Sequence, residues 1–284
     1  MILLNLRIFY ILIVMVLASG KNLAKNDSTQ SFFKKDNLVA WCIVPFDSKQ
    51  RTPKERAIMV AQLGLSKVAY DWRKPHVEFF EEEIIQYQKY GIEFFAFWGW
   101  HDNMGSLIPK YGIRPQIWKT LGSPREDTQN QRVKVAVKNM VPLAEKTGAL
   151  KLKLGLYNHG GWGGEPENLV AVCKELKRMG HKHTGIVYNF HHGHEQIKDF
   201  SQSFSIMKPH LLCLNLNGMS EESNFRKILP IGQGQHEKSM MQVIIEQKYR
   251  GPIGILGHVS NRDVKLVLKE NLLGLEKLSK ELQQ

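Results

Sequence analysis

Residues 185–194 read GIVYNFHHGH, an apolar run that ends in Asn189, His191, His192 and His194. The apolar part is short and does not alternate with polar residues, which is typical of a strand buried on both faces of a parallel sheet. A buried strand has no structural need to end in several imidazoles, so its end is a candidate functional site. That interpretation depends on how the other strands of the chain end.

The same pattern recurs along the chain, with short apolar runs separated by segments of helical periodicity. We expect strands at residues 38–46, 67–72, 94–100, 114–120, 152–159, 185–192, 211–218 and 252–258. Helix-end signals lie between them, such as Thr52 followed by Pro53 and Glu55. Eight strand–helix units of this size indicate an α/β fold, the (β/α)8 TIM barrel. A doubly wound open sheet is the alternative, but the strict alternation favours closure.

The N-terminus differs from the rest of the chain. Residues 1–7 carry one positive charge, residues 8–18 are apolar, and small residues follow. This pattern predicts a signal peptide at residues 1–20, a polar spacer at 21–36 and a single barrel domain at 37–284. We therefore expect a secreted or periplasmic protein with no stable membrane insertion after signal cleavage. Position 21 is Lys21, so no cysteine stands where a lipoprotein anchor requires one.

Charge and cysteine content exclude some classes of function. The formal net charge of the 284 residues is +12, but the lysines are scattered along helical segments and form no block. This favours a solvated basic surface over a nucleic-acid partner. Cys42, Cys173 and Cys213 lie inside apolar runs without metal-type spacing. We expect all three to be buried and unpaired.

Aromatic and amide side chains gather at the predicted C-terminal ends of the strands, which meet at one mouth in a TIM barrel. Aromatic faces with groups that both donate and accept hydrogen bonds suit a small-molecule carbohydrate. The candidate substrate-binding residues are Trp41, Asp71, Trp98, Trp100, Tyr157, Asn158, Trp162, Asn189, Asn215 and Asn217. For Trp41 and Trp118, simple filling of the top layer of the barrel is an equally good interpretation.

Two loops extend this predicted pocket. The segment GGWGGEPE (160–167) has four glycines around one tryptophan, which suits a mobile lid or an ordinary connection. The segment PIGQGQHE (230–237) runs into a helix, so its backbone amides can bind an anion or a hydroxyl, or merely close a turn. Gln233 in this loop is added to the candidate substrate-binding residues. We expect His194 to open the helix that follows the sixth strand.

The eight units, Asn189 with His192 three residues later, and GQGQHE (232–237) resemble the xylose-isomerase-like TIM barrel superfamily. This superfamily contains sugar phosphate isomerases and epimerases, and the AP endonuclease family 2 nucleases share its fold. The resemblance covers residues 38–280. It implies a barrel that acts on sugars and a divalent metal held by Glu, Asp, His and Glu at the ends of strands five to eight.

This chain departs from that metal pattern. The places of the ligands at the ends of strands five, six and seven hold Tyr157, Asn189 and Asn215. His258 lies near the place of the ligand at the end of strand eight, and His192 matches the superfamily's further histidine. Mg²⁺ and Mn²⁺ need anionic oxygen ligands, so we expect no carboxylate site for them.

A different metal site is conceivable from the same strand ends. Three neutral imidazoles, His159, His192 and His258, suit a divalent transition metal such as zinc, copper or nickel. The sequence does not decide whether the cofactor exists.

Three functions follow from the resemblance. The first is a sugar isomerase or epimerase in which His192, His159 and His258 are catalytic, with Lys153 and Asp71 as helpers. The second is a carbohydrate-binding protein on the same fold without catalysis. The third, a nuclease-like phosphodiesterase, is disfavoured because such enzymes need clusters of metal-binding carboxylates.

Overall fold

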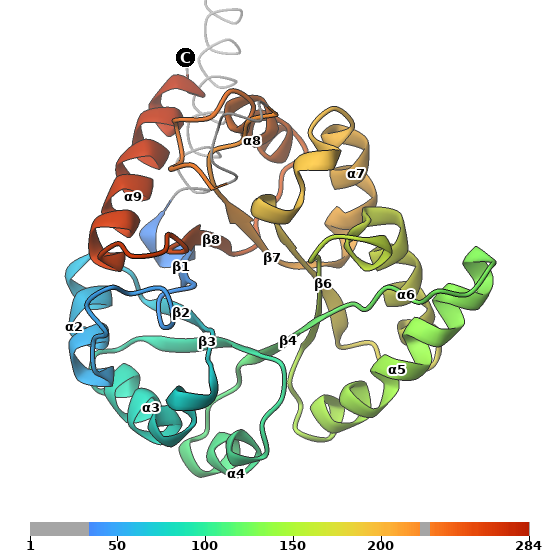
Figure 1. Ribbon diagram of the computed structural model, residues 1–284, viewed down its shortest axis with the longest axis horizontal. Coiled ribbons are helices and arrows are strands. Elements are labelled where there is room, and N and C mark those ends of the chain that lie inside the picture. Colours follow the sequence, from blue (N-terminus) through green and yellow to red (C-terminus); the bar gives the residue numbers. More distant parts are fainter. Residues whose placement is uncertain (1–33, 222–227, 284) are drawn as a thin grey trace, which may run out of the picture.

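Eight parallel strands form a closed barrel in this computed structural model, which describes residues 34–221 and 228–283 (Figure 1). Each strand pairs with its neighbours in sequence, and β1 pairs with β8 to close the ring. The strands are β1 (Leu38–Trp41), β2 (Lys67–Tyr70), β3 (Glu93–Trp98), β4 (Gln116–Thr120), β5 (Leu154–Tyr157), β6 (Thr184–Asn189), β7 (Leu211–Leu216) and β8 (Ile253–Leu256). The predicted TIM barrel is confirmed, and the open-sheet alternative is wrong.

Helices surround the barrel and connect successive strands (Figure 1). Thr52 forms the predicted capping box with Glu55 at the start of the first of them. The α-helices are α2 (Pro53–Gln62), α3 (Phe80–Lys89), α4 (Asp102–Tyr111), α5 (Gln129–Ala149), α6 (Pro166–Arg178), α7 (Phe200–Met207), α8 (Glu237–Glu246) and α9 (Val264–Glu281). None of the helices in the described part of the chain is long and apolar enough to cross a bilayer.

The predicted N-terminal segments fall almost entirely outside the described residues. The signal peptide at 1–20 lies outside them, as does all of the spacer at 21–36 except its last three residues. Lys35–Asn37 form a short 3-10 turn directly before β1. The barrel therefore begins at Leu38, where the sequence predicts its first strand.

Most strands end earlier than the sequence predicts, because the backbone turns where each strand leaves the sheet. Cys42 has a left-handed backbone with φ 56°, which ends β1, and Gly99 does the same after β3 with φ 65°. After β6 the residues Phe190–His192 form a 3-10 turn. His194 opens a second such turn, His194–Gln196, and the α-helix itself begins only at Phe200.

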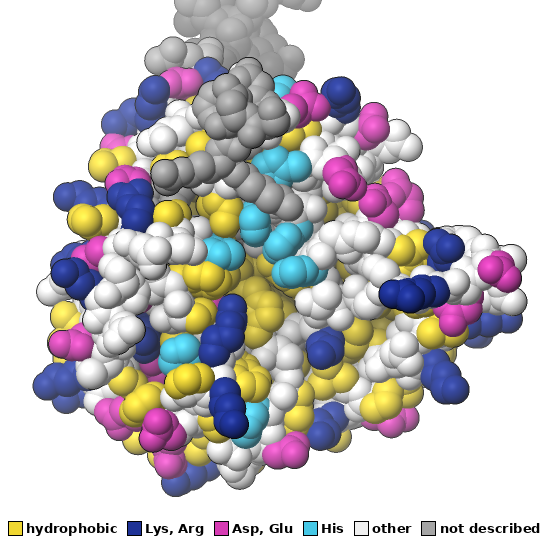
Figure 2. Space-filling model, viewed as in Figure 1, with side chains coloured by type: hydrophobic (Ala, Val, Ile, Leu, Met, Phe, Trp, Pro, Cys, Tyr) yellow, Lys and Arg dark blue, Asp and Glu magenta, His cyan; other side chains and the backbone are white. Residues whose placement is uncertain are grey.

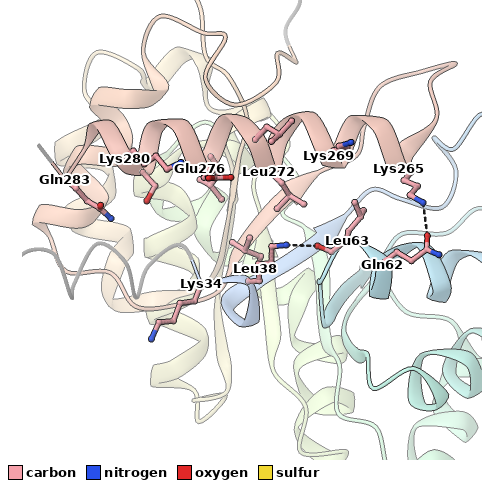
Figure 3. A pocket seen from close by; sticks show the side chains of 14 residues that line it. Lys34, Leu38, Gln62, Leu63, Lys265, Lys269, Leu272, Glu276, Lys280 and Gln283 are labelled. Carbon is pink, nitrogen blue, oxygen red and sulfur yellow. Dashed lines mark hydrogen bonds and ion pairs between the residues drawn. The ribbon is translucent and has the colours of Figure 1, made fainter.

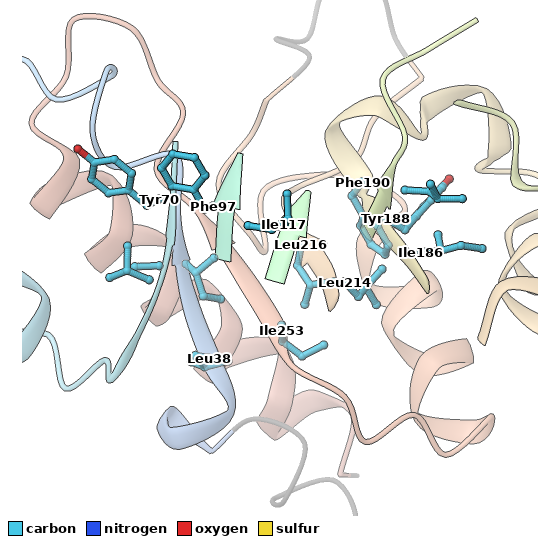
Figure 4. Close-up of a cluster of buried hydrophobic side chains, with 14 of the residues drawn as sticks. Leu38, Tyr70, Phe97, Ile117, Ile186, Tyr188, Phe190, Leu214, Leu216 and Ile253 are labelled. Carbon is cyan, nitrogen blue, oxygen red and sulfur yellow. The ribbon is translucent and has the colours of Figure 1, made fainter. Parts of the chain in front are cut away.

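The core has two layers that follow the alternation of side chains along each strand. The outer layer lies between strands and helices; Figure 4 shows part of it, including Tyr70, Phe97 and Leu214. On β5, Leu154 and Leu156 belong to this layer, whereas Tyr157 points into the barrel, as its phase predicts.

The inner layer fills the barrel. Its members are Val39, Trp41, Cys42, Ala69, Phe95, Ala96, Trp118, Tyr157, Val187, Cys213 and Leu256. The three cysteines are buried and free, which confirms their predicted state.

Candidate functional site

Four histidines form a continuous row at the C-terminal mouth of the barrel. The ring centroids of His159 and His192 are 4.2 Å apart, those of His192 and His191 are 4.3 Å apart, and those of His191 and His258 are 5.5 Å apart. The row joins the ends of β5, β6 and β8. Figure 2 shows histidine side chains grouped beside a hollow with a hydrophobic floor. The structure thus brings together the three predicted catalytic histidines, with His191 between His192 and His258.

The floor beneath this row is aromatic. The ring centroids of Trp41 and Trp118 are 4.3 Å apart, and both side chains are fully buried. Trp98 packs edge-on against Trp41 at 5.2 Å and against Tyr157 at 5.4 Å, and it is only half-buried. Trp41 and Trp118 therefore support the floor from below, while Trp98 retains surface that a ligand can contact.

A hydrogen-bonded chain of neutral side chains crosses the mouth just below the imidazoles. The Nδ2 of Asn189 donates to the hydroxyl of Tyr157 at 2.8 Å, and the Nδ2 of Asn215 donates to the Oδ1 of Asn189 at 2.8 Å. Asn158 accepts from the backbone N–H of Asn189 at 2.7 Å. Burial holds the pKa of Tyr157 well above its usual range, so the hydroxyl stays protonated. The chain fixes the end of β6 and with it the 3-10 turn that carries His191.

A cavity of about 270 Å³ opens beside His159 and His192. Its walls also include Glu165, Glu195 and Gln196, which come from the loops after β5 and β6. The Nε2 of Gln196 donates to Glu165 at 3.0 Å. Burial raises the pKa of the Glu165 carboxyl, and the negative charges of Glu195 and Glu167 raise it further. The cavity thus places a carboxyl with a raised pKa and three imidazoles, those of His159, His192 and His194, around one space.

Sequence reasoning missed Glu165 and Gln196. Both lie in polar loop segments without a strand-end pattern, and the cavity forms only when the loop after β5 meets the loop after β6. The segment GGWGG did indicate this region. A Cβ at Gly163 would collide with the carbonyl oxygen of Leu121, so this glycine allows the loop to pack closely on the neighbouring one.

A second polar group lies on the opposite side of the ring, at the ends of β1 and β2. Asp71 is 3% exposed, its Oδ1 accepts from the backbone N–H of Val44, and its Oδ2 has no hydrogen-bond partner among the described residues. Burial raises the pKa of Asp71 to about 6, against the weaker opposing effect of Arg73. Burial and the nearby Asp71 also raise the pKa of Cys42, which favours a neutral thiol.

His258 closes the row of imidazoles on this side. Its ring lies 3.6 Å from the ring of Phe46, centroid to centroid. Burial lowers the pKa of His258, and the positive charge of Arg73 lowers it further. At neutral pH the ring is therefore an uncharged acceptor or base.

Some of the predicted substrate-binding residues lie away from the row of histidines. The Nε1 of Trp100 donates to Asp102 on α4, and the Nε1 of Trp162 donates to Gln129 on α5. Asn217 is buried and donates to the backbone oxygen of Gly218.

The loop 230–237 folds on itself, because the Glu237 carboxylate accepts the backbone N–H groups of Gly232 and Gly234 at 3.0 and 2.8 Å. Gln233 is exposed in this loop. Lys153 is exposed just before β5, at the end of that strand opposite to Tyr157, so it lies far from the mouth.

The residues at the mouth do not fit a divalent metal in this arrangement. Within residues 34–221 and 228–283, no three His, Cys, Asp or Glu side chains are grouped so that they could hold a metal ion. His258 is separated from His192 by the ring of His191. The buried places at the ends of β5, β6 and β7 hold the neutral donors of Tyr157, Asn189 and Asn215, which bond to one another.

Neither a protein-family model nor a curated protein sequence matches this chain. Solved structures match its fold across most of its length. The 3-keto-D-glucoside 4-epimerase YcjR from E. coli has a TM-score of 0.62 at 12% identity, over 85% of this chain and 99% of that one. D-psicose 3-epimerase with D-tagatose from Clostridium cellulolyticum H10 has a TM-score of 0.59 at 11% identity, over 87% and 99%.

A xylose isomerase-like TIM barrel protein from Mycobacterium smegmatis, in complex with magnesium, is also similar. Its TM-score is 0.56 at 13% identity, over 86% of this chain and 97% of that one. At these identities the likeness shows the fold. The chain folds as a xylose isomerase-like TIM barrel, as the resemblance of its sequence implied.

Proposed function

We propose that this protein binds a small carbohydrate at the mouth of the barrel and isomerises or epimerises it by proton transfer between side chains. The observation that carries the proposal is the pair His159 and His192 on one cavity with Glu165. Isomerisation and epimerisation next to a carbonyl need one group that removes a proton from carbon and one that returns a proton. This cavity contains candidates for both roles.

The imidazoles take the role of base. A neutral imidazole can accept a proton, and histidine is the residue type that most often serves in general acid–base catalysis. The ring of His192 lies beside those of His159 and Tyr157, with centroid distances of 4.2 and 5.7 Å. We assign His192 as the group that removes the proton and His159 as the group that accepts from or donates to the neighbouring oxygen.

Glu165 takes the role of acid. Its raised pKa keeps a larger protonated fraction than an exposed glutamate has. Because Gln196 donates to one of its oxygens, the carboxyl group is held in one orientation toward the cavity. A protonated Glu165 can return a proton to the substrate after His192 has removed one.

The size and polarity of the cavity favour a sugar of monosaccharide size. A volume of about 270 Å³ is just below the range of roughly 300–1,000 Å³ that is usual for ligand pockets. Imidazole, carboxyl and amide groups offer donors and acceptors to hydroxyls, and the half-buried Trp98 offers ring surface nearby at the mouth. Two of the similar solved structures are named as epimerases of sugars, which supports this class of substrate.

We propose further that the reaction does not use a carboxylate-held divalent metal. The supporting observation is the chain from Tyr157 through Asn189 to Asn215, which occupies the places where the superfamily has metal ligands. Each of its side chains bonds to the next, and only the Oδ1 of Asn215 has no hydrogen-bond partner among the described residues. Positive charge that a metal would supply then arises only on an imidazole that has taken up a proton.

The N-terminal apolar run supports export to the periplasm or the exterior. Export favours free sugars or glycan fragments over sugar phosphates, which are mainly cytoplasmic metabolites.

A non-catalytic carbohydrate-binding protein is the second candidate. It is favoured by the neutral Tyr157–Asn189–Asn215 chain, which removes the charged groups that catalysis in the superfamily relies on. Both candidates require a sugar at the same mouth, and they differ only in whether the proton moves.

Thermal shift of the full chain against plain and phosphorylated mono- and disaccharides tests the binding. We expect at least one plain monosaccharide to raise the melting temperature of the parent protein. His192→Ala should abolish this rise, whereas His181→Ala, a histidine in the loop between α6 and β6, should keep it. A sugar that stabilises parent and His192→Ala equally would place the binding site elsewhere and overturn the proposal.

A further inference from the structure

A second hollow lies outside the barrel wall, beside α9. This α9 groove has a volume of about 720 Å³ and lies between α9, the end of α2 and the residues that precede β1 (Figure 3). Its apolar lining comes from Leu38, Leu63, Leu272, Leu273 and Leu275. The groove is larger than the cavity at the mouth and shares no residue with it.

Positive charge surrounds this apolar lining. Five lysines line the groove, Lys34, Lys35, Lys265, Lys269 and Lys280, against the single acidic residue Glu276. Among the described residues, Lys280 alone of these five forms an ion pair, with Glu276 at 2.7 Å. The groove therefore has a net positive charge that no acidic residue in the described part of the chain neutralises, apart from Glu276.

The outer face of α9 continues this surface. Leu266 and Leu273 are seven residues apart, so they share one face of the helix. Their side chains are 52% and 57% exposed, more than any other large hydrophobic residue in the described part of the chain. A helix that exposes leucines between lysines has the pattern of helices that lie in the surface of a bilayer.

The position of the N-terminus agrees with this pattern. Lys34 is the first described residue, and its side chain lines the groove (Figure 3). The chain before it contains the apolar run at residues 8–18. The described part of the chain therefore begins at the edge of the α9 groove.

We propose that the α9 groove and the outer face of α9 dock on the surface of an anionic lipid bilayer. The lysines would contact the anionic headgroups, and Leu266 and Leu273 would enter the boundary between headgroups and acyl chains. The mouth of the barrel, which opens along the barrel axis rather than through α9, stays accessible to a sugar. Such docking would keep the protein at the membrane to which its N-terminal run directs it.

Vesicle co-sedimentation of the full chain tests this proposal. The parent protein should bind vesicles with 30 mol% phosphatidylglycerol more tightly than pure phosphatidylcholine vesicles. The double variant Lys34→Glu and Lys269→Glu should lose this preference, with binding to the anionic vesicles about tenfold weaker or more. Leu273→Ser should weaken binding to the anionic vesicles as well.

Matched variants separate docking from the general attraction of a basic protein. Lys134→Glu with Lys138→Glu makes the same change in net charge on α5, where both lysines are exposed. Met179→Ser removes an exposed hydrophobic side chain after α6. These controls should keep the preference of the parent protein, and all variants should unfold cooperatively at the parental temperature.

Three results would overturn the proposal. One is a parent protein without preference for anionic vesicles. Another is an equal loss of binding in the α9 and α5 variants, which would show that only net charge matters. The third is a change from dimer to monomer in the α9 variants with unchanged vesicle binding, which would make a second copy of the chain the occupant of the groove.

Discussion

The imidazole rings of His159 and His192 lie 4.2 Å apart, centroid to centroid, although 32 residues, which include the whole of α6, separate them in the sequence. The parallel pairing of β5 with β6 brings their two strand ends together. Because both rings line one cavity with Glu165, a ligand in that cavity contacts all three groups. The account of the function rests on this relationship.

Replacing Glu165 with glutamine should separate catalysis from binding. Glutamine can still accept from the Nε2 of Gln196, but it cannot return a proton, so turnover should fall about 10²- to 10⁴-fold while sugar affinity changes little. Glu145→Gln, at an exposed position of α5, is the matched control and should retain parental turnover. Steady-state kinetics on the sugar found by thermal shift measure both. Equal rates for parent and Glu165→Gln would remove this residue from the mechanism.

Asp71 should make stability depend on pH. Burial raises its pKa from 3.8 in the unfolded chain to about 6, so the folded state binds the proton more tightly. The contribution of this group to the free energy of unfolding should therefore fall by about 3 kcal/mol as pH rises from about 4 to about 6. Above pH 6 it should stay level.

Asp71→Asn lacks this titration and keeps an oxygen for the N–H of Val44. Urea unfolding of both proteins at pH 4, 5, 6, 7 and 8 measures the difference, and the variant should gain relative stability as pH rises. If the difference between the two proteins is the same at pH 4 and pH 7, the carboxyl does not titrate as described.

The neutral chain across the mouth should be important for stability. Asn189→Ala removes the bonds to Tyr157 and Asn215 and leaves their polar groups buried. We expect a loss of about 2–4 kcal/mol in the free energy of unfolding. Asn139→Ala, at an exposed position of α5, should change it by less than about 0.5 kcal/mol. A loss at Asn189 no larger than at Asn139 would show that the chain does not hold the mouth together.

Divalent metals should not be needed. Extensive dialysis of the purified full chain against a chelator should leave its melting temperature and its response to the sugar unchanged, because neutral amides and a hydroxyl stand where a hard cation needs carboxylates. Elemental analysis before and after dialysis serves as the control. Loss of the sugar response on dialysis, with recovery on adding back zinc or manganese, would instead support a metal site formed by moving His159, His192 and His258 together.

The regular succession of eight short apolar runs and helical segments was enough to predict the barrel, and the period of two along a strand predicted the direction of its side chains. Leu154, Leu156 and Tyr157 on β5 are the clearest case. Side chains along a strand alternate between its two faces, so Leu154 and Leu156 share one face and Tyr157 lies on the other. The same logic placed Asn189 at the mouth and brought His159, His192 and His258 near one another.

The direction of side chains beyond the strand ends could not be predicted in this way. Trp100 and Trp162 follow strands, but their indole N–H groups bond to Asp102 and Gln129, and those partners are fixed only by how the loops meet the helices. Glu165 illustrates the reverse case. It carries no strand-end signal, and it joins the cavity because the loop after β5 folds against the loop after β6.

Hydrogen–deuterium exchange at the carbon of the bound sugar tests the central claim most directly. The full chain is incubated in deuterium oxide with a reducing monosaccharide that raises its melting temperature, and the proton next to the carbonyl is followed by NMR. The account predicts that this signal disappears as an isomer or epimer forms. The rate should be the same for the parent protein and His181→Ala, and at least about 100-fold lower for His192→Ala. A sugar that binds at the mouth without any exchange, or an exchange rate that His192→Ala leaves unchanged, would contradict it.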